Sequence, residues 1–496
     1  MAYVFTLLYV LVTLLTPGIF PKVIIDLHLA QILGWIAIVS CLAIIGEARL
    51  KTLPESSLVL GIFVAIAASI VAGGYMHNLL YKLPGSVPTL AVFYFILISC
   101  RTLKRVQGVI YALMFISLFI FANAAFAELT GDPNSLYILY GNHGLPDRWQ
   151  GLGFLSDPND TAQLFVTVIP LFWLRWRSGN HLANFLLTLL PAALLAAGVF
   201  FTHSRGGLVA LIAVVLFTFK DKLGLVRSSM LAALLLLGLL AVDVTGGRRV
   251  GDDDGRVVLW SKAMGAFKSH PFFGVGIDNF TQWDYYSNTA HNSFLLCLAE
   301  LGLFGYFFWM GTIVTCWTGL TDVIALQSKE EEAFPSVRAS SPDPHKPKKV
   351  VPMKPWLEAP ALNRPAAPAA VSAMASTGTP FHYAPPGSPS WMPAAAQLNT
   401  RPAEDDPADA ERRLFLAAKI FRISFVGLLT SSVFLSRTLS MVFFTVVGMS
   451  AALHMIILIG HPEQALDWKA ITKKVSIATV ASILILYAFM RARGGH

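Results

Sequence analysis

The sequence predicts an all-α fold: a polytopic transmembrane helical bundle of about 12 spans, or about 13 if a weak C-terminal segment also crosses. An external loop with amphipathic helices completes this prediction. Hydrophobic residues make up 55% of the 496 residues and charged residues 13%, whereas soluble domains are about one quarter charged. The mean hydropathy is +0.62, and apolar runs recur along the chain. This composition excludes an ordinary cytosolic enzyme, a disordered chain and a nucleic-acid-binding domain.

The apolar runs give the predicted spans, each close to the length of about 20 residues that a bilayer requires. The first run lacks a basic region before it and a small-residue cleavage site after it, so we expect it to be retained as a span. The predicted spans are 3–20, 27–46, 57–76, 87–100, 107–127, 161–176, 182–202, 206–220, 226–245, 291–319, 414–434 and 438–458, with a weaker segment at 475–490.

The positions of the cations predict the orientation of the bundle. Cytoplasmic loops carry an excess of Lys and Arg, and clusters of these residues follow the second, fourth, sixth and eighth predicted spans. The N-terminus is therefore expected in the cytoplasm, with the loops after odd-numbered spans outside. The segment 475–490 has basic residues on both flanks, so the sequence leaves open whether it spans, re-enters or lies along the surface.

The predicted organisation has five parts. Residues 1–245 form N-terminal transmembrane helices, 246–290 a periplasmic loop, 291–320 a transmembrane helix, and 413–496 C-terminal transmembrane helices. Residues 321–412 hold 16 of the 28 prolines, mixed with Ala, Ser and charged residues. Because such a segment buries too little apolar surface to offset its ordering entropy, it is predicted to be a disordered cytoplasmic loop.

Several kinds of site are absent from the sequence. There is no Gly-rich phosphate loop that ends in Gly-Lys-Ser/Thr, which argues against an ATP-driven motor. Among the acidic residues Glu300 alone lies deep in a predicted span, which argues against a pump. Cys41, Cys100, Cys297 and Cys316 all lie in apolar runs, so neither a disulfide framework nor a zinc site is predicted.

Ser204-Arg205-Gly206-Gly207 forms a tight turn between two spans on the predicted outer side. An arginine there does not serve as a positive-inside signal, and the glycines permit close approach of the backbone. It is either an interfacial arginine beside a glycine turn or a fixed cation for an anionic group at the membrane surface.

The loop 246–290 contains Asp252-Asp253-Asp254-Gly255-Arg256, followed by Val257, Trp260, Met264 and Phe267 at helical spacing. This pattern predicts an amphipathic helix in the plane of the membrane interface. The aspartates suit the helix N-terminus, whereas Arg256 opposes the helix dipole. A residue that breaks a local rule is a candidate functional residue. The aspartates form either a helix cap in a solvated turn or a site for a divalent metal ion.

His291-Asn292 lies at the outer mouth of the span 291–319. A helix N-terminus disfavours the imidazolium, so the neutral, basic form of His291 is expected. Alternatively, Asn292 or Ser293 caps the helix and His291 is an interfacial polar residue. In the preceding outer loop Arg148 is a further external cation, and Asp157 or Asp160 is expected to cap the span 161–176.

Taken together and in this order, these motifs resemble the O-antigen ligase and O-antigen polymerase superfamily of bacterial membrane glycosyltransferases. The resemblance covers roughly residues 30–320 and continues more loosely through 414–458. The matching residues are Arg148, the Asp157-Pro158-Asn159 stretch, Ser204 to Gly207, Gly255-Arg256 with Trp260, Pro271 to Gly276, and His291-Asn292 with Glu300 and Gly302. The insert at 333–410 and the extra C-terminal segment depart from the family pattern.

This resemblance implies transfer of a glycan from an undecaprenyl-diphosphate carrier to a glycan or glycolipid acceptor. The reaction is expected at the periplasmic face of the inner membrane, in lipopolysaccharide or other polysaccharide biosynthesis, with no cofactor, no metal ion and no nucleic acid. Arg205 and Arg256 are expected to grip the diphosphate, because guanidinium binds phosphate oxygens in a bidentate fork, and His291 to act as general base with inversion. Arg148, Ser204, Trp260 and Asn292 are the expected substrate-binding residues.

Other functions remain open at this point. A ligase and a polymerase share the donor chemistry, as does a bacterial protein O-oligosaccharyltransferase. A transporter or flippase of the same pathway is an alternative of another class, and so is an envelope scaffold that does no chemistry. Among these we favour the ligase or polymerase.

Overall fold

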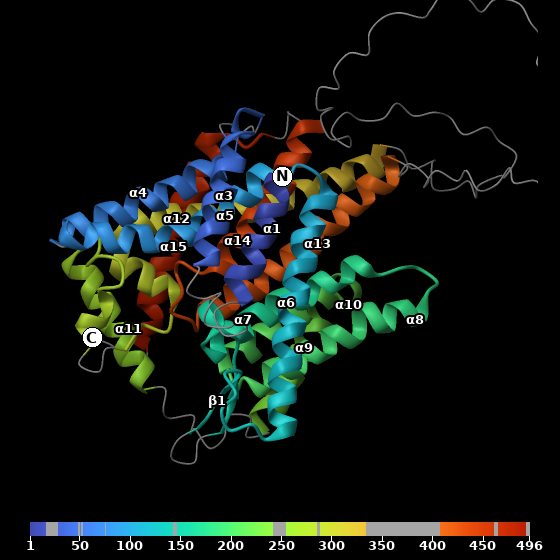
Figure 1. Cartoon of the computed structure of the whole chain (residues 1–496), viewed down its shortest axis with the longest axis horizontal. Helices are drawn as coiled ribbons and strands as arrows, with labels where there is room; N and C mark the ends of the chain where they lie inside the picture. Colours follow the sequence, from blue (N-terminus) through green and yellow to red (C-terminus); the bar gives the residue numbers. More distant parts are fainter. Residues whose placement is uncertain are drawn as a thin grey trace, which may run out of the picture.

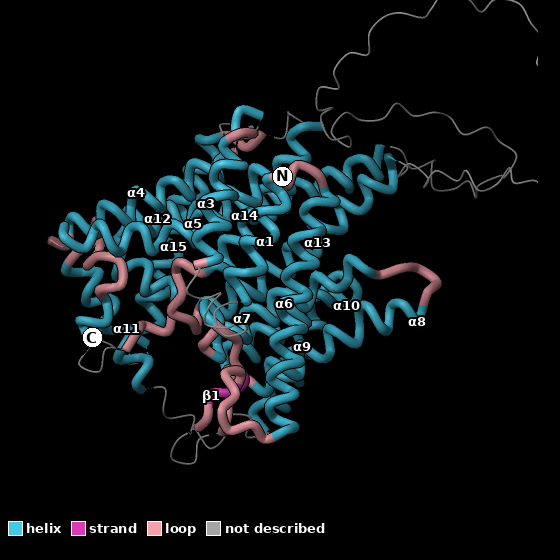
Figure 2. The backbone as a smooth tube through the Cα atoms, viewed as in Figure 1, coloured by secondary structure: helices cyan, strands magenta, loops and turns pink. Residues whose placement is uncertain are grey.

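Long apolar helices make up nearly all of the part of the chain that the computed structural model describes (Figures 1 and 2). The described residues are 1–15, 28–47, 50, 53–74, 76–141, 146–241, 254–284, 288–333, 407–460 and 465–492. Within them, eight helices are long and apolar enough to cross a membrane, and three apolar helices are shorter. The predicted all-α polytopic bundle is thereby confirmed.

The first half of the chain contains α1 to α10. The α-helices are α1 (Ala2–Leu15), α3 (Leu29–Leu42), α4 (Pro54–Ala72), α5 (Leu79–Ser99), α6 (Leu103–Thr130), α7 (Pro158–Val168), α8 (His181–Asn184), α9 (Leu190–Phe201) and α10 (Arg205–Ala241). The shorter elements are η1 (Ile45–Glu47), η3 (Met76–Asn78), η4 (Gly153–Leu155), η5 (Ile169–Arg175), η6 (Phe185–Leu189), and the antiparallel pair β1 (Ile138–Leu139) and β2 (Arg148–Trp149).

The second half contains α11 to α15. These helices are α11 (Asp254–Ser269), α12 (Ser293–Ala333), α13 (Pro407–Ser432), α14 (Met441–Gly460) and α15 (Trp468–Ala492), with the 3-10 turn η8 (Phe280–Trp283). The predicted loop 321–412 needs a correction at both ends. There α12 continues to Ala333 and α13 begins at Pro407, while residues 334–406 lie outside the described residues.

Within the described residues, every predicted span falls on helical structure, but several spans are not straight α-helices. The span 161–176 is α7 followed by the 3-10 segment η5. Pro170, the second residue of η5, has no N–H with which to continue an α-helix. The described parts of the spans 206–220 and 226–245 lie in α10, which is two helices that meet at a kink at Gly224, where the backbone φ is 77°.

The core of the bundle lies around α14, which packs mainly against α5 and α12. Within its most apolar window, 94% of α14 is buried inside the protein, against 17% for α15. Gly448 lets α14 approach α5 closely, because a Cβ there would lie 3.2 Å from the backbone of Phe93. The protein therefore encloses α14, whereas α15 is peripheral and offers its apolar surface to lipid.

The C-terminal segment is a long helix that runs antiparallel to α12. Tyr306 of α12 donates a hydrogen bond to Ser482 at 2.9 Å, and nearer the C-terminus Phe489 packs against Trp260 of α11 with ring centroids 5.6 Å apart. Arg491 is therefore at the end of the bundle that carries α11, which the predicted orientation places outside, where the positive-inside rule disfavours a cation.

A break in α12 accounts for the Pro271–Gly276 motif. Gly302 has a φ of 62°, which interrupts the helix and frees backbone groups on both sides of the break. Such groups inside a membrane bundle need partners within the protein. The Pro271–Gly276 segment supplies them through bonds from Val275 N to Ala299 O (2.9 Å), Gly276 N to Glu300 O (3.1 Å), Leu303 N to Pro271 O (2.8 Å) and Phe304 N to Phe272 O (3.0 Å). The motif is thus the structural complement of the break.

Candidate active site

The turn between α13 and α14, residues 433–440, joins the starts of three other helices. Its bonds to the residues that open α12 are the most numerous. Ser436 Oγ accepts from the backbone N–H of His291 and from Thr289 Oγ1, Ser293 Oγ donates to Leu435 O, the N–H of Arg437 donates to Ser293 Oγ, and Thr438 Oγ1 donates to Ser293 O. This turn therefore fixes the backbone on which His291 sits.

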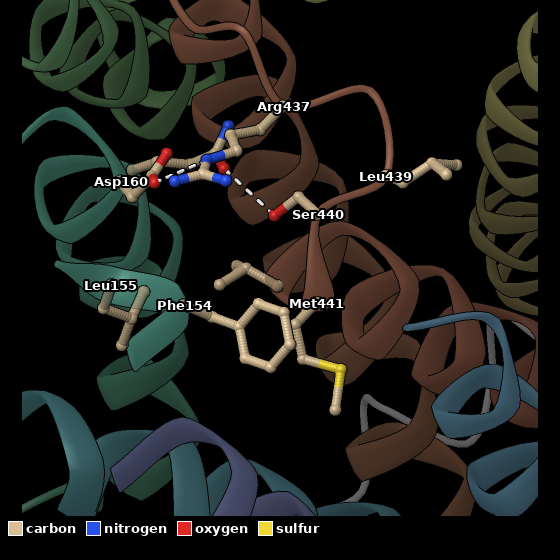
Figure 3. Close-up of a pocket in the computed structure, with 9 residues that line it drawn as sticks. Phe154, Leu155, Asp160, Arg437, Leu439, Ser440 and Met441 are labelled. Carbon is tan, nitrogen blue, oxygen red and sulfur yellow. Dashed lines mark hydrogen bonds and ion pairs between the residues drawn. The ribbon is translucent and has the colours of Figure 1, made fainter. Parts of the chain in front are cut away.

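The same turn also contacts the starts of α7 and α10. Arg437 Nε donates to Asp160 Oδ2 of α7 at 2.8 Å, and Figure 3 shows this ion pair beside Ser440. Phe434 packs against Gly206 of α10 so closely that a Cβ on this glycine would lie 2.4 Å from the Phe434 Cβ. Three helix starts, those of α7, α10 and α12, thus meet at one turn.

Ser204 and Arg148 are linked through one amide. Ser204 Oγ caps α10 by accepting from the N–H of Gly207 at 3.1 Å, and it donates to Asn159 Oδ1 at 2.8 Å. Arg148 Nη2 donates to the same oxygen at 3.2 Å, while its Nε donates to Thr202 O at 2.9 Å. The structure therefore brings the guanidinium of Arg148 to the turn that carries Arg205.

Arg205 is the first residue of α10, where the helix dipole is positive. A cation in this position is unfavourable for the helix and is offset when an anion binds beside it. The Arg205 side chain is half-buried, which holds it near the turn. Its position therefore places a cation at a helix start that Ser204 caps.

Electrostatics place Arg256 and Asp157 near His291. Burial lowers the pKa of the His291 imidazole below its usual value, the positive charge of Arg256 lowers this pKa further, and the negative charge of Asp157 raises it. The neutral form expected from the sequence is thus favoured, although for a different reason, since burial contributes more than any other cause. His291 also has a φ of 48°, an uncommon conformation for a residue with a side chain.

The two remaining predicted residues, Asn292 and Trp260, have clear packing roles. Asn292 Oδ1 caps α12 by accepting from Phe294 N at 2.9 Å and Leu295 N at 3.1 Å. Trp260 is buried in α11 against Phe489 and near Met490 of α15. Among the described residues, the Asn292 Nδ2 and Trp260 Nε1 donors have no partner. Their assignment to substrate binding stays a prediction.

Of the two aspartates that the sequence offers as a helix cap in the earlier outer loop, one caps α7 and the other forms an ion pair. Asp157 is the N-cap of α7, since its Oδ1 accepts from the N–H of Asn159 at 2.7 Å. Asp160 instead pairs with Arg437. Burial raises the pKa of the Asp160 carboxyl to about 7, and the charge of Arg437 opposes this effect.

The predicted metal alternative at the aspartate triplet falls largely outside the described residues, because Asp252 and Asp253 are not among them. Within the described residues, no group of three or more His, Cys, Asp or Glu side chains is arranged to hold a metal ion.

Arg437 is a charged residue of this site that the sequence analysis did not single out. The sequence contains the feature that could have identified it. Arg437 is the one charged residue in the short connection between the predicted spans 414–434 and 438–458. That connection is on the predicted outer side, as is the turn that carries Arg205. The argument used for Arg205 therefore applies equally to Arg437.

Comparison with known proteins agrees with the motifs. Residues 190–310 match a family model described as O-antigen ligase, and this segment includes Ser204, Arg205, Arg256 and His291. The similarity to the O-antigen ligase superfamily that the motifs predict is thereby confirmed. A comparison with curated proteins found no match.

Proposed function

We propose, from the similarity of residues 190–310 to O-antigen ligases, that this protein transfers a glycan from an undecaprenyl-diphosphate carrier to a sugar hydroxyl. The observation that carries the proposal is that His291, whose backbone is bound by Ser436, is half-buried and lies within the electrostatic influence of Arg256, so that burial first and Arg256 second lower the pKa of its imidazole. We place the reaction at the periplasmic face of the bacterial inner membrane, and we propose that it needs no metal ion or cofactor.

The proposed role of Arg205 and Arg256 follows from where charge develops. As the bond between the anomeric carbon and the diphosphate oxygen breaks, negative charge grows on the departing lipid diphosphate. Guanidinium groups bind phosphate oxygens in a bidentate fork and stay charged at all working pH values. Preorganised donors of this kind each contribute about 10²–10³-fold to kcat in other enzymes. Arg148 is held to the Arg205 turn, and we assign it a supporting role.

His291 is the proposed general base. The acceptor oxygen forms a bond to the anomeric carbon from the face opposite the diphosphate, and its proton passes to the imidazole. The bond to the diphosphate oxygen takes its electron pair with it, so undecaprenyl diphosphate leaves and the anomeric centre inverts. The imidazolium then releases the proton to water. Such a base contributes about 10²–10⁴-fold, and burial, which lowers the pKa of the His291 imidazole below its usual value, favours the unprotonated form that a base requires.

A transfer assay tests the proposal. The purified protein is given a synthetic polyprenyl-diphosphate glycan and a lipid A core acceptor, and the mass and anomeric configuration of the product are measured. We expect an inverted product, no effect of EDTA, and loss of activity in the His291→Ala and Arg205→Lys proteins. The control is Arg175→Gln, because Arg175 ends η5 and packs over Tyr111. Full activity in the His291→Ala protein would contradict the role of the base.

The acceptor separates the related functions. A strain that lacks the gene accumulates long unligated chains if the protein is a ligase, and single-repeat products if it is a polymerase. Loss of glycan from secreted proteins instead indicates a protein O-oligosaccharyltransferase. Donor lipid trapped on the cytoplasmic side indicates a flippase.

A further inference from the structure

Arg437 uses only part of its guanidinium within the protein. Its Nε donates to Asp160 at 2.8 Å, and its backbone N–H donates to Ser293. Among the described residues, neither Nη nitrogen of Arg437 donates a hydrogen bond. The side chain is 45% exposed, whereas that of Asp160 is 6% exposed. The carboxylate therefore holds the guanidinium from the protein side and leaves the opposite edge accessible.

The surroundings of this ion pair are hollow, and both polar and apolar side chains line them. A cavity of about 60 Å³ lies beside it, lined by Asp160, Arg437, Gln163 and Ser440 among others (Figure 3). Gln163 is fixed by hydrogen bonds from its Nε2 to Ser431 at 3.1 Å and to Ser432 at 3.0 Å. Hydrogen bonds therefore hold the orientations of Gln163, Asp160 and Arg437, which line the cavity.

This cavity adjoins the proposed active site. Arg437 directly follows Ser436, whose hydroxyl accepts from the N–H of His291. Asp157 is close enough for its charge to affect both Asp160 and His291. The exposed edge of Arg437 therefore lies near the proposed base, although His291 and Arg437 are 146 residues apart in the sequence.

We propose that Arg437 is a further donor-binding residue, whose free guanidinium edge binds a phosphoryl oxygen of the lipid diphosphate, with Asp160 as its positioning residue. This inference rests on the proposed function. An alternative explanation is that Arg437 only neutralises a buried carboxylate. The two explanations differ in what happens when both charges are removed together, because that change leaves no buried charge unpaired.

The test measures binding of undecaprenyl diphosphate to the full chain in detergent, through the rise in its unfolding temperature, together with transfer activity. The variants are Arg437→Gln, Arg437→Lys, Asp160→Asn, and the double variant Arg437→Gln with Asp160→Asn. The control is Arg422→Gln, since Arg422 lies on α13 over the ring of Trp317. We expect the control to bind undecaprenyl diphosphate as tightly as the wild-type protein.

We expect the double variant to fold and to lose activity by about 10²–10³-fold, as when other preorganised donors to a transition-state anion are removed. We also expect the Lys variant to fold, because its charge still pairs with Asp160, and to bind the lipid at least about tenfold more weakly. Lysine has no planar fork with which to bind the carboxylate and a phosphate together.

Wild-type activity in the double variant, or wild-type affinity in the Lys variant, would overturn the inference while leaving the proposed function in place. Failure of the wild-type protein itself to bind undecaprenyl diphosphate would instead contradict the proposed function. If the double variant does not fold, the Lys variant and Asp160→Asn decide the question. Unchanged affinity in either of them would overturn the inference.

Discussion

The hydroxyl of Ser436 accepts a hydrogen bond from the backbone N–H of His291, so a turn near the C-terminus fixes the residue that opens α12. His291 has a φ of 48° at this point, a conformation that persists only where the surrounding structure supports it. The position of the proposed base is therefore set from outside its own helix.

Replacement of Ser436 by Ala is expected to reduce transfer activity about tenfold with little loss of stability. One hydrogen bond is worth about 0.5–1.5 kcal/mol, but a small misplacement of a catalytic group costs far more in rate. The measurements are steady-state transfer kinetics and thermal unfolding. Ser69→Ala serves as the control, because Ser69 donates only to Ile66 of its own helix. A Ser436→Ala protein with wild-type kcat would show that the bond does not position His291.

Removing the charge of Arg256 and removing that of Asp157 are expected to shift the pH dependence of transfer in opposite directions. A base must be neutral, so activity falls as the pH drops through the pKa of His291, which burial, and then Arg256, hold below its ordinary value. In the Arg256→Gln protein this pKa rises, and the acid limb of the residual activity moves to higher pH. In the Asp157→Asn protein the pKa falls and the limb moves to lower pH.

Asn is as good an N-cap as Asp, so Asp157→Asn is expected to preserve α7. The pH–rate profiles of the three proteins, each normalised to its own maximum, are the measurement. Two profiles that coincide with the wild-type profile would remove His291 as the titrating base.

The break in α12 is expected to tolerate no side chain at Gly302. A Cβ there would lie 2.5 Å from the backbone of Gly274 and Phe272, at a φ of 62°. With a ψ of −167° this backbone conformation is essentially confined to glycine and costs an L-residue about 1–3 kcal/mol. Together with the close contacts, it is expected to make Gly302→Ala lower the free energy of unfolding by at least about 2 kcal/mol. Gly265→Ala is the matched control, since a Cβ at Gly265 meets nothing within 4 Å. Equal unfolding temperatures for the two variants would contradict the structure of this break.

The ion pair between Glu55 and His454 is expected to act on stability alone. The two side chains are buried, and His454 Nδ1 lies 2.9 Å from Glu55 Oε1, which joins α4 to α14. Removing one member of a buried pair lowers the free energy of unfolding by about 3–5 kcal/mol, and removing both members lowers it by less. The measurements are the unfolding free energies of Glu55→Gln, His454→Gln and the double variant, with activity per folded molecule as the control. Additive losses would show that the two groups are not coupled.

Cysteine labelling tests the expected orientation. Cysteines introduced at Arg205, Arg256 and His291 are expected to react with a membrane-impermeant thiol reagent from the periplasmic side. The four native cysteines are buried, so their background labelling is expected to be low. Labelling of the three positions from different sides of the membrane would contradict a shared site.

The sequence by itself determined the class of fold and most of the charged residues of the site. Hydropathy and the positions of short-loop cations are local properties of the chain, and they need no knowledge of which helices touch. His291 could be selected because it lies at the outer mouth of a predicted span, and Arg205 and Arg256 could be selected because each is a cation where a local rule disfavours one. Arg437 could also have been selected on this ground, but it lies outside the motifs of the matching family segment.

Only the tertiary structure decided which helix starts meet. The contact from Arg437 to Asp160 joins residues 277 positions apart, and that from Ser436 to His291 joins residues 145 positions apart. No periodicity in the sequence encodes such pairs, because they depend on how the helices pack against one another. The helix caps formed by Asn292 and Asp157 and the burial of Trp260 were decided in the same way, since capping and burial depend on the final backbone and on the partners that folding brings to it.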